Sequence, residues 1–172
     1  PILNELEILQ IMKQIKNGLQ YLYKENIIHR DLKPQNILVT KNLIIKISDF
    51  GFAKIYTEGS LTQTICGSPL YMAPEILTYK QYTELADLWS VGVILYEIMF
   101  KEVPITGSNL YSLVKNIQSY NFKLTKKQKK MYSTKILNLL ERLLIKNPEK
   151  RIDWKNFFDH QWFYDKVECK EM

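Results

Sequence analysis

The sequence predicts one mainly helical domain with a single short β-hairpin, and three observations support this fold class. The chain has 172 residues, 46% of them hydrophobic and 24% charged, which is enough for one domain with its own core. Apolar residues recur at helical spacing over most of the chain, whereas two short segments alternate as strands do. Neither an internal repeat nor a linker rich in glycine, serine or proline divides the chain, so we expect one unit as far as about Tyr164.

The first helix is expected to begin at Asn4, whose side chain caps it while Glu7 reaches back to the capping residue. The apolar face predicted for this helix comprises Leu6, Leu9, Met12 or Ile15, Leu19 and Leu22. The helix is expected to end near Lys24.

Residues 36–39 and 44–48 are predicted to form the hairpin, joined by a short polar turn. The polar, aperiodic residues 56–68 are typical of a long functional loop. A helix from Thr83 or Glu84 to Phe100 is apolar almost all round, so we expect it to be central and buried. Further helices are expected over residues 109–118, 133–145 and 154–159.

Composition excludes several classes of protein. Cys66 and Cys169 are the two cysteines and have no metal-ligand spacing, so we expect no disulfide framework, no zinc site and an intracellular, cytoplasmic protein. The longest apolar stretch, residues 91–100, is interrupted by Glu97 and is too short to span a membrane. Because the first residues are not a charged and then apolar run, no secretory leader is expected.

Much of the net charge of +6 comes from one cluster of lysines. These are Lys123, Lys126, Lys127, Lys129 and Lys130. The run is typical of a solvated loop and helix start, and the alternative is a patch for an acidic partner, an anionic membrane or nucleic acid. Because almost no aromatic residues interleave with the lysines, a nucleic-acid-binding domain is not expected.

Two polar segments flank the predicted hairpin. Residues 29–36 read H-R-D-L-K-P-Q-N, and residues 49–51 read D-F-G. A hairpin of this length returns the chain, so Asn36 and Asp49 are expected to face one site. Amide and carboxylate oxygens suit Mg²⁺.

With the A-P-E at residues 73–75, these segments resemble the motif set of the protein kinases, in order and at kinase-like spacing. The resemblance covers roughly residues 2–163 and implies a protein kinase-like fold, C-terminal lobe only, over residues 1–163, with a short tail at 164–172. It implies a serine/threonine kinase that transfers the γ-phosphate of ATP to protein hydroxyls. Lys33, two residues after Asp31, and Ser68, at a position usually held by threonine, mark that specificity.

The resemblance also implies a role for each matching residue. Asp31 is expected to be the catalytic base, Lys33 to offset charge on the transferring phosphate, and Ser68 to hydrogen-bond toward both. Asn36 and Asp49 are expected to hold Mg²⁺. The residues expected at the bound ATP are Lys33, Gln35, Asn36, Leu38 and Asp49.

Regulatory and structural roles are implied in the same way. Arg30 resembles the arginine that binds a phosphorylated activation loop, with Lys54 as a second positive charge. Thr64, or else Thr62, is the candidate phosphate acceptor, and the alternative is that both are ordinary loop hydroxyls. Expected structural roles are a buried ion pair of Glu75 with Arg151, support of the catalytic-loop backbone by Asp87, and packing of His29 and Phe50 in the regulatory hydrophobic stack.

The residues at 49–53, 66–75 and 151–158 resemble the autophagy-initiating serine/threonine kinases most, with the calcium/calmodulin-dependent group as second choice.

The N-terminal kinase lobe has no counterpart in the sequence, since the six glycines are scattered and no early strand carries a V-A-I-K-like lysine. Two interpretations remain open. One is a fragment of an active kinase whose N-lobe, in cis or in trans, clamps ATP. The other is a truncated, non-catalytic binding module or decoy. The intact set of Asp31, Lys33, Asn36 and Asp49 favours the first, and Ile37, Leu38 and Phe50 are expected to expose apolar surface at the cleft.

Overall fold

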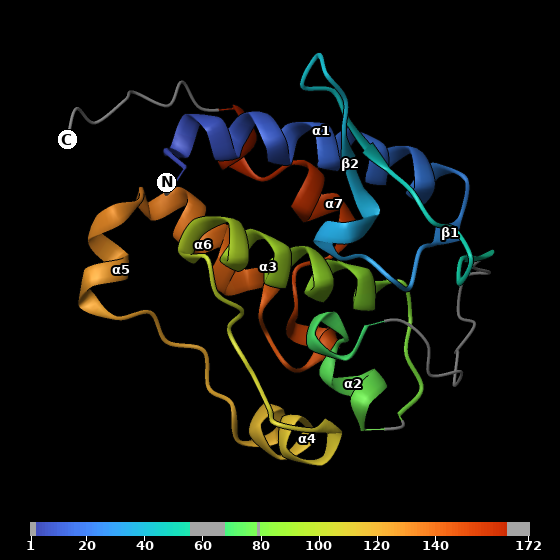
Figure 1. Cartoon of the computed structure of the whole chain (residues 1–172), viewed down its shortest axis with the longest axis vertical. Coiled ribbons are helices and arrows are strands. Elements are labelled where there is room, and N and C mark those ends of the chain that lie inside the picture. Colours follow the sequence, from blue (N-terminus) through green and yellow to red (C-terminus); the bar gives the residue numbers. More distant parts are fainter. Residues whose placement is uncertain (1–2, 56–67, 79, 165–172) are drawn as a thin grey trace.

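The computed structural model describes residues 3–55, 68–78 and 80–164, and these residues form a mainly helical domain (Figure 1). The helices are α1 (Glu5–Lys24), α2 (Pro74–Leu77), α3 (Leu85–Phe100), α4 (Leu110–Ser119), α5 (Lys126–Met131), α6 (Thr134–Leu143) and α7 (Trp154–Phe158). The strands are β1 (Ile27–Ile28), β2 (Ile37–Val39), β3 (Ile45–Ile47) and β4 (Lys54–Ile55).

Helix α1 begins with the predicted capping box. The Asn4 side chain accepts a 2.9 Å hydrogen bond from the Glu7 N–H, and Glu7 accepts one of 2.8 Å from the Asn4 N–H. The buried face differs by one position from the prediction, because Ile8 is buried and Leu6 only half-buried. Ile8 lies four residues before Met12, so it continues the buried stripe along one side of the helix.

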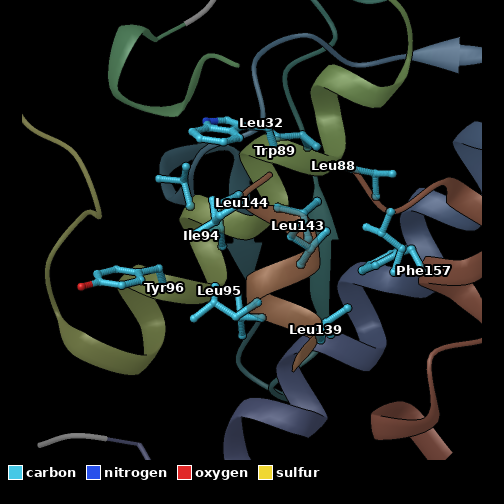
Figure 2. Close-up of a cluster of buried hydrophobic side chains, with 14 of the residues drawn as sticks. Leu32, Leu88, Trp89, Ile94, Leu95, Tyr96, Leu139, Leu143, Leu144 and Phe157 are labelled. Carbon is cyan, nitrogen blue, oxygen red and sulfur yellow. The ribbon is translucent and has the colours of Figure 1, made fainter. Parts of the chain in front are cut away.

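Helix α3 runs through the middle of the domain, as its apolar sequence predicted (Figure 1). Figure 2 shows Leu88, Ile94 and Leu95 of α3 beside side chains of α6 and α7. Gly92 allows α6 to approach closely, since a Cβ there would lie 2.9 Å from Leu143 Cβ. Through Asp87 and Ser90, α3 contacts the segment after β1 and the residues just before α2.

The predicted hairpin is present as the antiparallel pair β2–β3, with Ile37 opposite Ile47 and Val39 opposite Ile45. It lies across α1, because Gln14 Oε1 accepts a 2.9 Å hydrogen bond from the Ile45 N–H. A left-handed Leu43, at φ 58°, forms the turn.

Other short elements were not predicted. Strands β1 and β4 pair antiparallel, with Ile28 opposite Lys54, but two residues are too few to show alternation. Helix α2 is a single turn that starts at a proline. Helix α5 carries four of the clustered lysines, all exposed, which is compatible both with a solvated helix start and with a patch for an acidic partner. Within the described part of the chain, no helix is long and apolar enough to cross a membrane.

Candidate active site

The segment between β1 and β2 is anchored to α3 by Asp87, which lies in the first turn of that helix. The Asp87 carboxylate accepts hydrogen bonds from the backbone N–H groups of His29, at 2.7 Å, and Arg30, at 2.9 Å. Burial raises the pKa of the Asp87 carboxyl, against the opposing effect of these two bonds. Because α3 is central, this anchor fixes the start of the segment to the core.

Asp31 is the centre of the site and is only 4% exposed. Its Oδ2 accepts hydrogen bonds from Lys33 Nζ at 2.7 Å and Asn36 Nδ2 at 3.1 Å, and its Oδ1 accepts one from the Ser68 N–H at 2.8 Å. Burial acts to raise the pKa of Asp31, but Lys33, Ser68 and Asn36 together outweigh it and hold the pKa below its usual value. The group is therefore a carboxylate at neutral pH.

Lys33 joins the two sides of the site. Besides its bond to Asp31, Lys33 Nζ donates a 2.9 Å hydrogen bond to Ser68 Oγ. The hydroxyl of Ser68 thus meets Lys33, whereas its backbone N–H meets Asp31. Lys33 remains partly exposed, with 21% of its side chain accessible, but its ammonium group points into the site toward Asp31 and Ser68.

Asn36 and Asp49 lie at the same end of the hairpin, because the Ser48 N–H donates a 2.9 Å hydrogen bond to the Asn36 carbonyl. The Asn36 amide nitrogen is engaged with Asp31, and its amide oxygen accepts no hydrogen bond from the residues that the structure describes. Asp49 is exposed and left-handed, at φ 63°, and accepts a 3.2 Å bond from the Gly51 N–H. One exposed carboxylate and one amide oxygen of the largely buried Asn36 fit Mg²⁺, which takes few protein ligands and keeps several waters.

His29 is fully buried, and its ring centroid lies 5.2 Å from that of Phe50. Its Nδ1 accepts a hydrogen bond from the Asp31 N–H, so Nε2 carries the proton and donates to the Ser48 carbonyl at 3.0 Å. These contacts place His29 between the segment that carries Asp31 and the end of the hairpin. Phe50 is 47% exposed.

Of the residues expected to bind or carry a phosphate on the activation loop, the structure describes Arg30 and Lys54. Arg30 is left-handed at φ 68°, and its Nε donates to the Phe52 carbonyl. Lys54 lies on the exposed strand β4, which pairs with β1 just before Arg30. Thr64 and Thr62 lie outside the described residues, so their role stays a prediction. Gln35, in the turn before β2, and Leu38, within β2, are both exposed.

Glu75 and Arg151 form a buried two-pronged ion pair, with N–O distances of 2.8 and 2.9 Å. Arg151 also donates to the backbone carbonyls of Leu85, Ile145 and Lys146. The pair therefore ties α2 to the start of α3 and to the segment after α6.

Several contacts of the site were not predicted from the sequence. The carbonyls of Ser48 and Phe52 hold His29 and Arg30, and Ser90 Oγ donates to the Tyr71 carbonyl at 2.8 Å. Backbone carbonyls are present at every residue, so residue type carries no signal for them.

Comparison with protein families matches residues 1–163 to the protein kinase domain. The chain is 47% identical to the serine/threonine-protein kinase atg1 of Dictyostelium discoideum, over 93% of this chain and 24% of that protein. It is 40% identical to the serine/threonine-protein kinase ATG1c of Arabidopsis thaliana, over 96% of this chain and 23% of that protein. It is 37% identical to the serine/threonine-protein kinase ATG1 of Kluyveromyces lactis, over 92% and 22%.

The chain spans about a quarter of the length of these curated relatives. Their names confirm the narrower resemblance that the sequence predicted, to the autophagy-initiating branch. With a family match over almost its whole length, the chain belongs to the protein kinases, among their serine/threonine-specific members.

Proposed function

We propose that the protein transfers the γ-phosphate of ATP to serine or threonine hydroxyls of protein substrates, with Asp31 as catalytic base. The observation that carries this proposal is the convergence of Lys33, Asn36 and Ser68 on the buried Asp31 carboxylate. Three hydrogen-bond donors fix the orientation of this carboxylate, whereas an aspartate on the surface is usually hydrogen-bonded to water.

Asp31 orients the substrate hydroxyl and accepts its proton as the new bond from that oxygen to phosphorus forms. The bond from the γ-phosphorus to its bridging oxygen breaks, and ADP leaves with the electron pair. Phosphoryl transfer passes through a loose transition state, so orientation matters more than base strength and a carboxylate of low pKa suffices. Lys33 offsets the negative charge that develops beside Asp31.

Asn36 and Asp49 are the proposed metal ligands, each contributing an oxygen at the same end of the hairpin. When bound, Mg²⁺ neutralises negative charge on the phosphate oxygens of ATP. Gln35 and Leu38 complete the proposed ATP contacts from the exposed side of the hairpin.

Residues 1–163 are assigned to the C-terminal lobe and residues 164–172 to a short tail. An N-terminal lobe, in cis or in trans, then completes ATP binding, because the six scattered glycines form no phosphate-covering loop. The apolar surface beside the hairpin supports this, since Leu38, Val39 and Phe50 are 52, 60 and 47% exposed. A non-catalytic binding module has no physical need for Asp31, Lys33, Asn36 and Asp49 together.

The test is transfer of labelled γ-phosphate from Mg·ATP to a generic protein substrate, by the protein alone and joined to a kinase N-lobe. With the N-lobe, we expect label on serine and threonine, and a loss of at least about a hundredfold in Asp31→Asn. The control Asp159→Asn makes the same change at an exposed position after α7 and leaves the rate unchanged.

Full activity of Asp31→Asn would remove the proposed base. If neither form of the protein transfers phosphate, the non-catalytic binding module becomes the better interpretation.

A further inference from the structure

A cavity of about 420 Å³ lies between the end of α1, strand β1 and the first turns of α3 and α7. None of the residues proposed to contact ATP or substrate lines it. Leu19, Leu22 and Ile28 are buried and form its apolar floor, whereas Tyr23 and Lys24 are exposed at its rim. It is therefore open to solvent and separate from Asp31.

Two buried polar atoms at this cavity have no hydrogen-bond partner. They are Glu84 Oε2 and Trp154 Nε1, and no other buried side-chain atom of the described residues shares that property. Both residues line the cavity, and Trp154 is only 5% exposed. A buried acceptor and a buried donor left unpaired are costly, so both favour a ligand here.

The cavity has the volume of a small-ligand pocket and not that of a site for a single water. A water molecule takes up about 30 Å³ of liquid volume, whereas small-ligand pockets measure about 300–1,000 Å³. At about 420 Å³ the cavity falls in the second class.

The charged groups around the cavity favour a cation. Glu84 and Asp87 are acidic and the C-terminal end of α1 carries a partial negative charge, whereas the N-terminal end of α3 contributes a partial positive one. Both Asp87 oxygens already accept backbone hydrogen bonds, so Glu84 is the acidic group left for a ligand. Lys24 is the basic residue at the rim and forms no ion pair with Glu84 within the described parts of the chain.

Aromatic rings complete this environment. The ring centroids of Tyr23 and Trp154 lie 5.7 Å apart, and Trp154 stacks on Phe158 at 5.4 Å. Aromatic faces attract ammonium and guanidinium groups, so the rings and Glu84 act in the same direction.

We propose that this cavity binds a peptide through an arginine or lysine side chain, with the cation at Glu84 and a peptide carbonyl at Trp154 Nε1. A bare organic cation offers donors only and would leave the indole N–H unpaired. A basic residue in a peptide offers both a cation and an acceptor, and its aliphatic stem packs against Leu19 and Leu22. The site is a peptide-docking position independent of phosphoryl transfer.

The experiment is an NMR titration of the intact protein, followed at the Trp154 indole N–H and the backbone amides of β1. The probe is N-acetyl-arginine N-methylamide, and its neutral isostere with citrulline serves as the matched control. We expect saturable shifts with the arginine probe and binding at least about tenfold weaker for citrulline.

Variants separate contact from general charge. Glu84→Gln should weaken the arginine probe about tenfold and leave the citrulline probe unchanged. Glu25→Gln removes the same charge from an exposed neighbouring position that does not line the cavity, and should change binding less than about twofold. Unchanged resonances far from the cavity establish that each variant is folded.

The carbonyl contact has its own test. Butylguanidinium should bind more weakly than the arginine probe, and Trp154→Phe should remove most of that difference, read at the β1 amides. Equal binding of arginine and citrulline, an equal loss in Glu25→Gln, or no saturable shift at all would overturn the proposal and leave a cavity that holds water.

Discussion

The backbone N–H of Arg30 donates a 2.9 Å hydrogen bond to the carboxylate of Asp87, a residue 57 positions further along the chain. Arg30 has φ 68°, a conformation that a long side chain rarely adopts. The bond that Asp87 accepts from Arg30, with the one it accepts from the His29 N–H, offsets the cost of that conformation and fixes the backbone just before Asp31.

Asp87→Asn is therefore expected to destabilise the fold and the site together. An amide turned toward these backbone groups sets one N–H donor against another, so the free energy of unfolding should fall by about 1–3 kcal/mol. Urea unfolding measures this loss. The control Asp153→Asn keeps an N-cap oxygen on α7 and should change stability little. Equal stability of the two variants would show that the Asp87 bonds are dispensable.

The buried pair of Glu75 and Arg151 predicts a marked asymmetry between single and double variants. Arg151→Met leaves the Glu75 charge buried alone and should cost about 3–5 kcal/mol of unfolding free energy. Replacing Glu75 by Leu in the same chain should recover part of that loss. Arg151→Lys should also destabilise, because one ammonium group cannot reach Glu75 and the carbonyls that Arg151 contacts. Chemical denaturation measures the unfolding free energy of each variant. No recovery of stability in the double variant would contradict the prediction.

Lys33→Met predicts a change in pH dependence. Burial raises the pKa of Asp31 and Lys33 is the main opposing group, so its removal should raise that pKa. The acid limb of kcat against pH, measured with the N-lobe present, should move to higher pH.

Stability should follow the same sign. A depressed Asp31 pKa contributes stability above the pKa of the unfolded chain, and that contribution is lost as pH falls through the folded value. Lys33→Met should lose it and unfold at a less acidic pH. Lys115→Met, at an exposed position of α4, is the control, and identical pH profiles for both variants would argue against the Lys33–Asp31 coupling.

Asp49→Asn tests the proposed metal site. Replacing a carboxylate by an amide weakens a Mg²⁺ ligand, so the half-saturating Mg²⁺ concentration for phosphate transfer should rise at least about tenfold. The amide oxygen can still accept from the Gly51 N–H, so stability should change little. A Mg²⁺ titration of the rate measures the effect. An unchanged half-saturation point would place the metal elsewhere.

Short-range sequence patterns predict much of the secondary structure of this protein. The Asn4 cap, the hairpin around residue 42 and the buried helix α3 each follow from residue types within a few positions of one another. The kinase motifs are equally local, so the sequence alone predicts Asp31, Asn36 and Asp49 as a set.

Contacts between distant segments required the folded chain. The sequence predicts that Ser68 meets Asp31 and Lys33, but the use of its backbone N–H for one and its hydroxyl for the other depends on how residues 68–71 and α2 pack on α3. The cavity at Glu84 and Trp154 joins residues 70 positions apart and has no sequence motif. Periodicity and capping involve residues within one or two helical turns of each other. Contacts between distant segments depend instead on how the whole hydrophobic core is buried, and no local sequence pattern predicts that.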